Sequence, residues 1–106
     1  MISSIRRLQS TAPHFQLLYF CPSDRFPSFE THLLECAAQA GPIEIERLAH
    51  PAALARRARF AAFVSPVLPT VVLLRDNELI AQAVGNLPRY ELRVLLGRAA
   101  ASGALR

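Results

Sequence analysis

The sequence predicts a single α/β domain with a mixed central sheet between helices, and three observations lead to that fold class. Strand-like patterns at 15–20 and 43–48 enclose a helical pattern, which predicts a parallel crossover. Further along, apolar runs at 71–74 and 79–84 flank Asp76-Asn77, which predicts an antiparallel hairpin. The 106 residues are 52% hydrophobic, which is enough to bury one core without metals or disulfides.

The N-terminal part of the chain contains one ambiguous segment and one clear strand. Apolar residues at positions 2, 5 and 8 suit either a short first strand or a frayed helical turn. The aromatic and aliphatic run 15–20 has the length of a strand and is bounded by Pro13 and Pro22. We therefore expect 15–20 to be a central strand.

A helix is expected over residues 27–40. Its apolar positions recur at helical spacing, and the Gly-Pro pair at 41–42 ends it. Ser23 or Asp24 is available as the N-terminal cap. Cys36 lies in the middle of this helix, next to an Ala-Ala pair, and is expected to be buried as a core or boundary residue.

The remaining elements follow from periodicity and from proline positions. The alternation of apolar and charged residues at 43–48 predicts a half-buried strand. An alanine-rich helix is expected over 52–63, and a last helix with one apolar face begins at Pro88. Residues 100–106 are expected to form a loose tail, which leaves a core of about 15–99 within one domain, 1–106.

Around the hairpin, the chain resembles the C-terminal half of the thioredoxin family. There, an Ile/Leu-Pro-Thr step with a cis proline opens a strand, a turn and a second strand that closes on a glycine. Leu68-Pro69-Thr70 matches that step, Asp76-Asn77-Glu78 stands where Asn-Gly-Glu is usual, and Gly85 has the expected spacing. The resemblance covers about 15–99 and implies a thioredoxin-like three-layer α/β/α sandwich, with the bond before Pro69 cis. An ordinary trans proline that opens an edge strand is the alternative.

The redox motif of that family is missing from this chain. Thioredoxins use Cys-X-X-Cys at a helix N-terminus, where the helix dipole lowers the pKa of the first thiol. Asp24-Arg25-Phe26-Pro27 stands in that place, and an aspartate does not exchange disulfides. A second alignment sets Cys21-Pro22-Ser23-Asp24 over the motif and leaves Cys21 as a single-thiol nucleophile that glutathione would resolve. The simpler interpretation of Cys21 is a small buried residue that ends a strand.

The resemblance also implies a shallow apolar groove that holds an extended peptide. Three segments would form it: the residues before the first long helix, the proline loop, and the loop after the last strand. The expected partner-binding residues are Asp24, Arg25, Phe26, Pro66, Val67, Leu68, Pro69, Asn86 and Leu87. An apolar patch with polar edges suits peptide or protein recognition. The alternative is that these loops only pack against one another.

Charge and composition argue against several classes of function. All 12 basic residues are arginine and are spread along the chain, with a net charge of +4, which argues against a nucleic-acid stripe. Because no apolar run reaches membrane-spanning length and no secretory signal is recognised, we expect a cytoplasmic protein without a membrane partner. His14, His32 and His50 lack metal-ligand spacing, so no metal or other cofactor is expected.

Two local groups of charged residues have simple structural interpretations. Glu44 and Glu46 alternate along one strand and are expected on an exposed strand face rather than in an acid–base pair. Arg56, Arg57 and Arg59 are interpreted as a solvated helix face, although such a cluster also suits an acidic partner.

The predicted function is a redox-inactive thioredoxin-like module that binds another protein or a peptide segment, as an assembly factor or chaperone does. Residues 85–92, Gly-Asn-Leu-Pro-Arg-Tyr-Glu-Leu, resemble the helix opening of thioredoxin-like hydrogenase-expression chaperones, which lack the cysteine pair. Two alternatives stay open. One is a monothiol thiol-disulfide oxidoreductase that uses Cys21, and the other is a structural subunit that docks through the outer sheet edge or the arginine-bearing helix. The sequence identifies neither the client nor the oligomeric state.

Overall fold

The computed structural model describes residues 14–22 and 26–101 of the chain. The expected first strand or turn at 2–8 and residues 102–106 of the expected tail lie outside this part, as do the cap candidates Ser23 and Asp24 and the groove residue Arg25. Residues 100–101, also expected in the tail, belong to the last helix instead. The elements follow in the order β1 (Phe15–Phe20), α2 (Pro27–Ala40), β2 (Glu44–Arg47), α3 (Pro51–Arg57), β3 (Thr70–Arg75), β4 (Glu78–Val84) and α4 (Arg89–Ala101).

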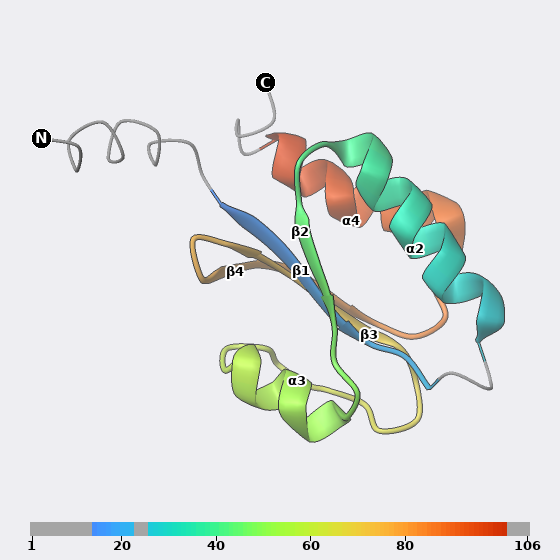
Figure 1. Cartoon of the computed structure of the whole chain (residues 1–106), viewed down its shortest axis with the longest axis vertical. Helices are drawn as coiled ribbons and strands as arrows, with labels where there is room; N and C mark the ends of the chain where they lie inside the picture. Colours follow the sequence, from blue (N-terminus) through green and yellow to red (C-terminus); the bar gives the residue numbers. More distant parts are fainter. Residues whose placement is uncertain (1–13, 23–25, 102–106) are drawn as a thin grey trace, which may run out of the picture.

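The four strands form one mixed sheet in the order β2-β1-β3-β4 (Figure 1). β1 pairs with β2 in parallel and with β3 in antiparallel orientation, and β3 and β4 are antiparallel. The parallel pair requires a crossover, which α2 supplies, whereas the hairpin places β4 at the opposite edge. The predicted mixed sheet with an antiparallel edge is therefore confirmed.

Helices cover both faces of the sheet, which gives the three layers that the sequence predicts (Figure 1). The larger core lies under α2 and α4 and contains Leu17, Phe29, Leu73 and Leu92, none of them more than 2% exposed. The smaller core lies under α3, which contributes its fully buried Leu54. Cys36 is 3% exposed in the larger core, so the prediction that it is buried is confirmed.

The hairpin turns at Asp76 and Asn77, as predicted. Both residues have positive φ, 50° and 70°, a conformation that aspartate and asparagine tolerate better than other non-glycine residues. The turn is also fixed to the start of β1. The His14 backbone N–H donates to Asp76 Oδ1 at 3.0 Å, and the Asp76 backbone N–H donates to the His14 carbonyl at 2.8 Å.

α2 has the predicted bounds. Phe26 is the N-cap residue, and its own side chain makes no capping hydrogen bond. Pro27 follows at the first helical position, where its missing N–H needs no partner and its fixed φ suits the first turn. The predicted cap candidates Ser23 and Asp24 lie outside the described residues.

Two expected elements differ from the structure. The alanine-rich helix ends at Arg57 instead of 63, because the chain beyond it is held by the sheet: the Ala62 backbone N–H donates to the Gln82 side chain, whose amide donates to the Phe63 carbonyl. β2 is exposed at all four positions rather than half-buried. It lies at the sheet edge, where alternation of apolar and charged residues does not guarantee that a helix covers one face.

Candidate partner-binding groove

The segments that the resemblance assigns to a groove meet at one end of the sheet. The register pairs Phe20 at the end of β1 with Thr70 at the start of β3, and Thr70 with Val84 at the end of β4. The Gly85 backbone N–H donates to the Pro69 carbonyl at 2.8 Å, which fixes the loop after β4 beside the proline loop. α2 begins at this same end, at the lower right of Figure 1.

Ser65 shapes the proline loop. Its hydroxyl oxygen accepts the backbone N–H groups of Val67 and Leu68 at 3.1 and 3.0 Å, while the Ser65 backbone N–H donates to Thr70 Oγ1 at 3.2 Å. Ser65 and Thr70 are both buried, at 3% and 0% exposed. The loop is therefore anchored from below and presents Val67, 55% exposed, and Leu68, 39% exposed, to solvent.

The proline itself departs from the expectation. The bond between Leu68 and Pro69 is trans, since no peptide bond in the described residues is cis. The alternative, a trans proline that opens an edge strand, is right about the isomer but wrong about the strand, because Pro69 leads into β3, which is paired on both sides. In this chain the Ser65 hydroxyl closes the loop, and the ordinary trans isomer satisfies that turn.

The other predicted groove residues divide by exposure. Pro66 and Asn86 are exposed, whereas Phe26 and Leu87 are partly buried and pack against the larger core. Pro69 is fully buried and supports the surface from below rather than forming part of it. In the described residues, the accessible part of the predicted groove is therefore the tip 66–68 together with Asn86.

Cys21 directly follows β1, with its Sγ 3.9 Å from the Phe26 carbonyl oxygen, and has the properties of a core residue. It is 3% exposed, and both cysteines are free thiols. Burial raises its pKa, the nearby Glu30 carboxylate raises it further, and Arg47 partly opposes them. A nucleophilic cysteine needs an accessible thiol of lowered pKa. Both properties of Cys21 are the opposite of what a monothiol oxidoreductase requires.

A polar cluster next to Cys21 was not anticipated from the sequence. The Tyr19 hydroxyl donates to Glu30 Oε2, and Arg47 Nε lies 3.1 Å from the same carboxylate oxygen. Arg47 also donates to the Cys21 carbonyl at 3.0 Å. Burial, and then the bond to Glu30, raise the pKa of Tyr19. The cluster ties the ends of β1 and β2 to the first turn of α2 and supports the groove end of the sheet.

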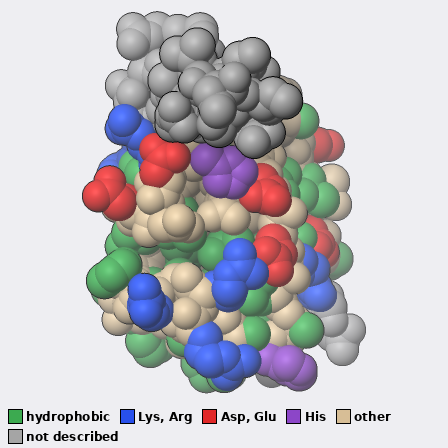
Figure 2. Space-filling model, turned by 60° about the vertical axis from the view of Figure 1, so that its left-hand side comes forward, with side chains coloured by type: hydrophobic (Ala, Val, Ile, Leu, Met, Phe, Trp, Pro, Cys, Tyr) green, Lys and Arg blue, Asp and Glu red, His purple; other side chains and the backbone are tan. Residues whose placement is uncertain are grey.

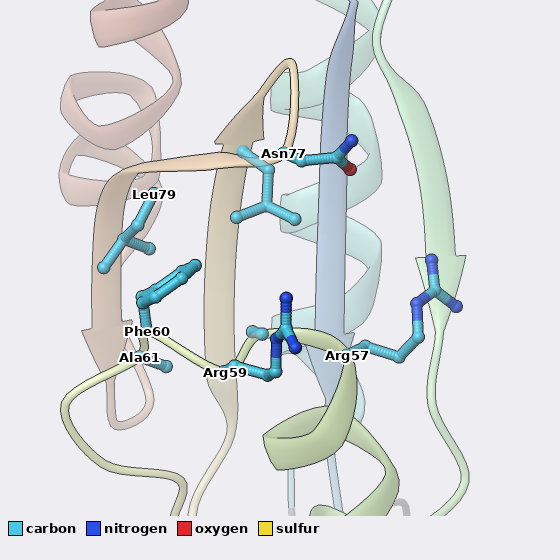
Figure 3. Close-up of a pocket in the computed structure, with 8 residues that line it drawn as sticks. Arg57, Arg59, Phe60, Ala61, Asn77 and Leu79 are labelled. Carbon is cyan, nitrogen blue, oxygen red and sulfur yellow. The ribbon is translucent and has the colours of Figure 1, made fainter.

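On the opposite face, two of the three clustered arginines, Arg57 and Arg59, are among the residues that line a cavity of about 210 Å³ between 57–61 and the β3–β4 hairpin. Arg57 pairs with Glu46 of β2 at 2.8 Å, and the Arg59 guanidinium lies 5.8 Å from the centre of the Phe60 ring. Figure 3 shows Arg59 and Asn77 extending over the cavity from opposite sides, while Arg57 points away toward β2. All three arginines of the predicted face are exposed.

The described surface combines both signs of charge. On the face shown in Figure 2, acidic and basic side chains are interspersed with apolar ones. No group of three His, Cys, Asp or Glu side chains in the described part of the chain is arranged to hold a metal ion. Within 14–22 and 26–101 no helix is long and apolar enough to cross a membrane.

Comparison with known proteins gives the fold. No protein-family model matches the chain, and no curated protein matches it. Among solved structures, it is similar to thioredoxin-2 of the malaria parasite, described as a component of the parasite's protein secretion machinery. The two share 18% of their residues over 81% of this chain and 84% of the other, with a TM-score of 0.58. The chain therefore has a thioredoxin-like fold, and its two cysteines are not paired in a Cys-X-X-Cys arrangement.

Proposed function

We propose that this chain is a redox-inactive thioredoxin-like module that holds a segment of another protein on the tip of its proline loop, as an assembly factor or chaperone does. The observation that carries the proposal is the pair Val67 and Leu68, exposed to solvent on a loop that Ser65 anchors. Exposed apolar side chains on a fixed backbone lose little conformational entropy on binding, which favours their use in recognition.

The state of Cys21 supports a binding role over thiol chemistry. The thiol is buried, and burial raises its pKa, which favours the protonated form. A partner is therefore expected to be held by apolar contacts rather than by a mixed disulfide. An extended segment with apolar side chains is the kind of partner that the exposed apolar tip 66–68 suits. A relationship to hydrogenase-expression chaperones stays a prediction from residues 85–92.

The experiment places a photo-crosslinking amino acid at position 67 of tagged protein in its own cells. The matched control carries the crosslinker at Phe60, which is also exposed and apolar, at 69%, but lies on the α3 face. We expect a crosslinked partner from position 67 and not from position 60. The partner is expected in equal yield with and without reductant, and also in Cys21→Ser.

A substitution tests the same surface without a crosslinker. Leu68→Asp is expected to weaken partner capture about tenfold or more, because binding would desolvate the new carboxylate. Phe60→Asp, with the same change of character on the other face, is expected to keep capture. Unchanged capture by Leu68→Asp would exclude this loop as the binding site, and a partner released only by reductant would support the thiol alternative.

A further inference from the structure

An open groove runs along the outer edge of the sheet, between β4 and α4. Its volume is about 340 Å³, and its floor is formed by the small side chains of Ala81 and Ala83. Tyr90 and Val94 of α4 stand along its rim and are 65% and 63% exposed. This combination of a shallow floor and exposed apolar side chains leaves a sheet edge and a helix flank uncovered together.

The backbone of β4 is prepared to pair with another strand. Along an antiparallel strand, the backbone N–H and C=O groups point alternately toward the paired strand and away from it. The Gly85 N–H points toward β3, because it donates to the Pro69 carbonyl. The N–H and C=O groups of Val84 and Gln82 therefore point away from β3. No other described strand pairs with that edge. Edge strands are usually protected by charges or proline, yet β4 has neither after Glu78.

The charges along α4 identify what fits this edge. Glu91 and Arg98 both line the groove on either side of Val94, and neither forms an ion pair within the described part of the chain. If a second α4 lies antiparallel across a two-fold axis at Val94, Arg98 of each copy comes opposite Tyr90 and Glu91 of the other. The surface is therefore complementary in charge to itself.

One two-fold axis can relate both β4 and α4 to their copies. From Val84 back to Gln82 the strand rises about 7 Å, and from Arg89 to Val94 the helix rises about 7.5 Å. Since β4 and α4 run in opposite directions from the short connection between them, Gln82 and Val94 lie at about the same height. A single two-fold axis can therefore pair β4 with its copy at Gln82 and α4 with its copy at Val94.

We propose that two copies of this chain form a two-fold symmetric dimer through the β4 edge and α4, with Gln82 and Val94 at the axis and reciprocal Glu91–Arg98 pairs beside it. The dimer joins two four-stranded sheets into one, and Tyr90 of each copy covers the groove of the other. This inference concerns a different surface from the proline loop and does not depend on the proposed function.

Sedimentation velocity across a dilution series of the full chain tests the proposal. Wild type is expected to sediment with twice the monomer mass of 11.7 kDa at high concentration. Arg98→Glu replaces both attractive pairs by repulsive ones and is expected to raise the dimer dissociation constant about tenfold or more. Glu91→Arg combined with Arg98→Glu restores opposite charges and is expected to recover the dimer. Arg93→Glu is the control, because Arg93 lies on the other flank of the same helix.

A second measurement examines the strand edge directly. Amide hydrogen exchange of Gln82 and Val84 is expected to slow as protein concentration rises, and this change is expected to be absent in Arg98→Glu. A wild-type protein that stays monomeric throughout the dilution series would overturn the proposal. So would a dimer that Arg98→Glu leaves intact, or exchange at Gln82 and Val84 that does not depend on concentration.

Discussion

Removing the hydroxyl that anchors the proline loop is expected to destabilise the domain and to loosen the candidate groove. In Ser65→Ala, the backbone N–H groups of Val67 and Leu68 lose their acceptor, at 3.1 and 3.0 Å in the native loop. Each such bond contributes about 1 kcal/mol, so the loss of both would lower the free energy of unfolding by at most about 2 kcal/mol. Because Val67 and Leu68 are exposed, water replaces part of the loss, and we expect about 1–2 kcal/mol.

Urea unfolding gives this free energy directly, and thermal unfolding is expected to shift by about 4–8 °C for each kcal/mol. The control is Ser28→Ala, at an exposed serine on α2 that does not cap the helix, for which we expect a change within about 0.5 kcal/mol. The amides of Val67 and Leu68 are expected to exchange faster in Ser65→Ala. The reasoning is refuted if Ser65→Ala matches wild type both in stability and in the exchange of these two amides.

Two further predictions concern buried titratable groups. Burial raises the pKa of Cys21, so its thiol is expected to react with an alkylating reagent much more slowly in the folded chain than in urea, and equal rates would contradict its burial. Burial and Glu30 raise the pKa of Tyr19, so the folded chain binds that proton more tightly than the unfolded chain. The stability from this group is complete below the ordinary tyrosine value of 10.0 and is lost as the pH rises above it. Cys21→Ser serves as the background, because the raised pKa of Cys21 would also make stability depend on pH. Above pH 10.0, the free energy of unfolding in urea is expected to fall more steeply with pH in Cys21→Ser than in Cys21→Ser combined with Tyr19→Phe. Equal slopes in the two variants would exclude Tyr19 as the cause.

The proposed dimer interface and the proposed groove lie on adjoining parts of the surface, but each proposal can be tested and refuted without the other. Leu87 is predicted as a groove residue, and it also lines the cavity between β4 and α4. Arg98→Glu is expected to separate the copies without affecting capture at Val67, while Leu68→Asp is expected to leave the dimer intact. If Arg98→Glu abolished partner capture together with the dimer, partner binding would require the dimer.

The sequence alone determined the elements whose signals are local. The apolar run of β1, the helical period and Gly-Pro end of α2, and the Asp76-Asn77 turn each depend on neighbouring residues, and all three were predicted with their bounds. The ordered set around Leu68-Pro69-Thr70 and Gly85 led to the fold class, which the structure confirms. The absence of a Cys-X-X-Cys motif is likewise a fact of sequence.

Only the tertiary structure decided how distant residues compete for the same backbone. α3 ends early because Gln82, on another element, holds Ala62 and Phe63. The proline is trans in a loop that Ser65 closes by side-chain hydrogen bonds, which no periodicity encodes. The physical reason is the same in each case. Periodicity indicates which face of an element is apolar, but the partners of a polar group depend on which segments folding brings together.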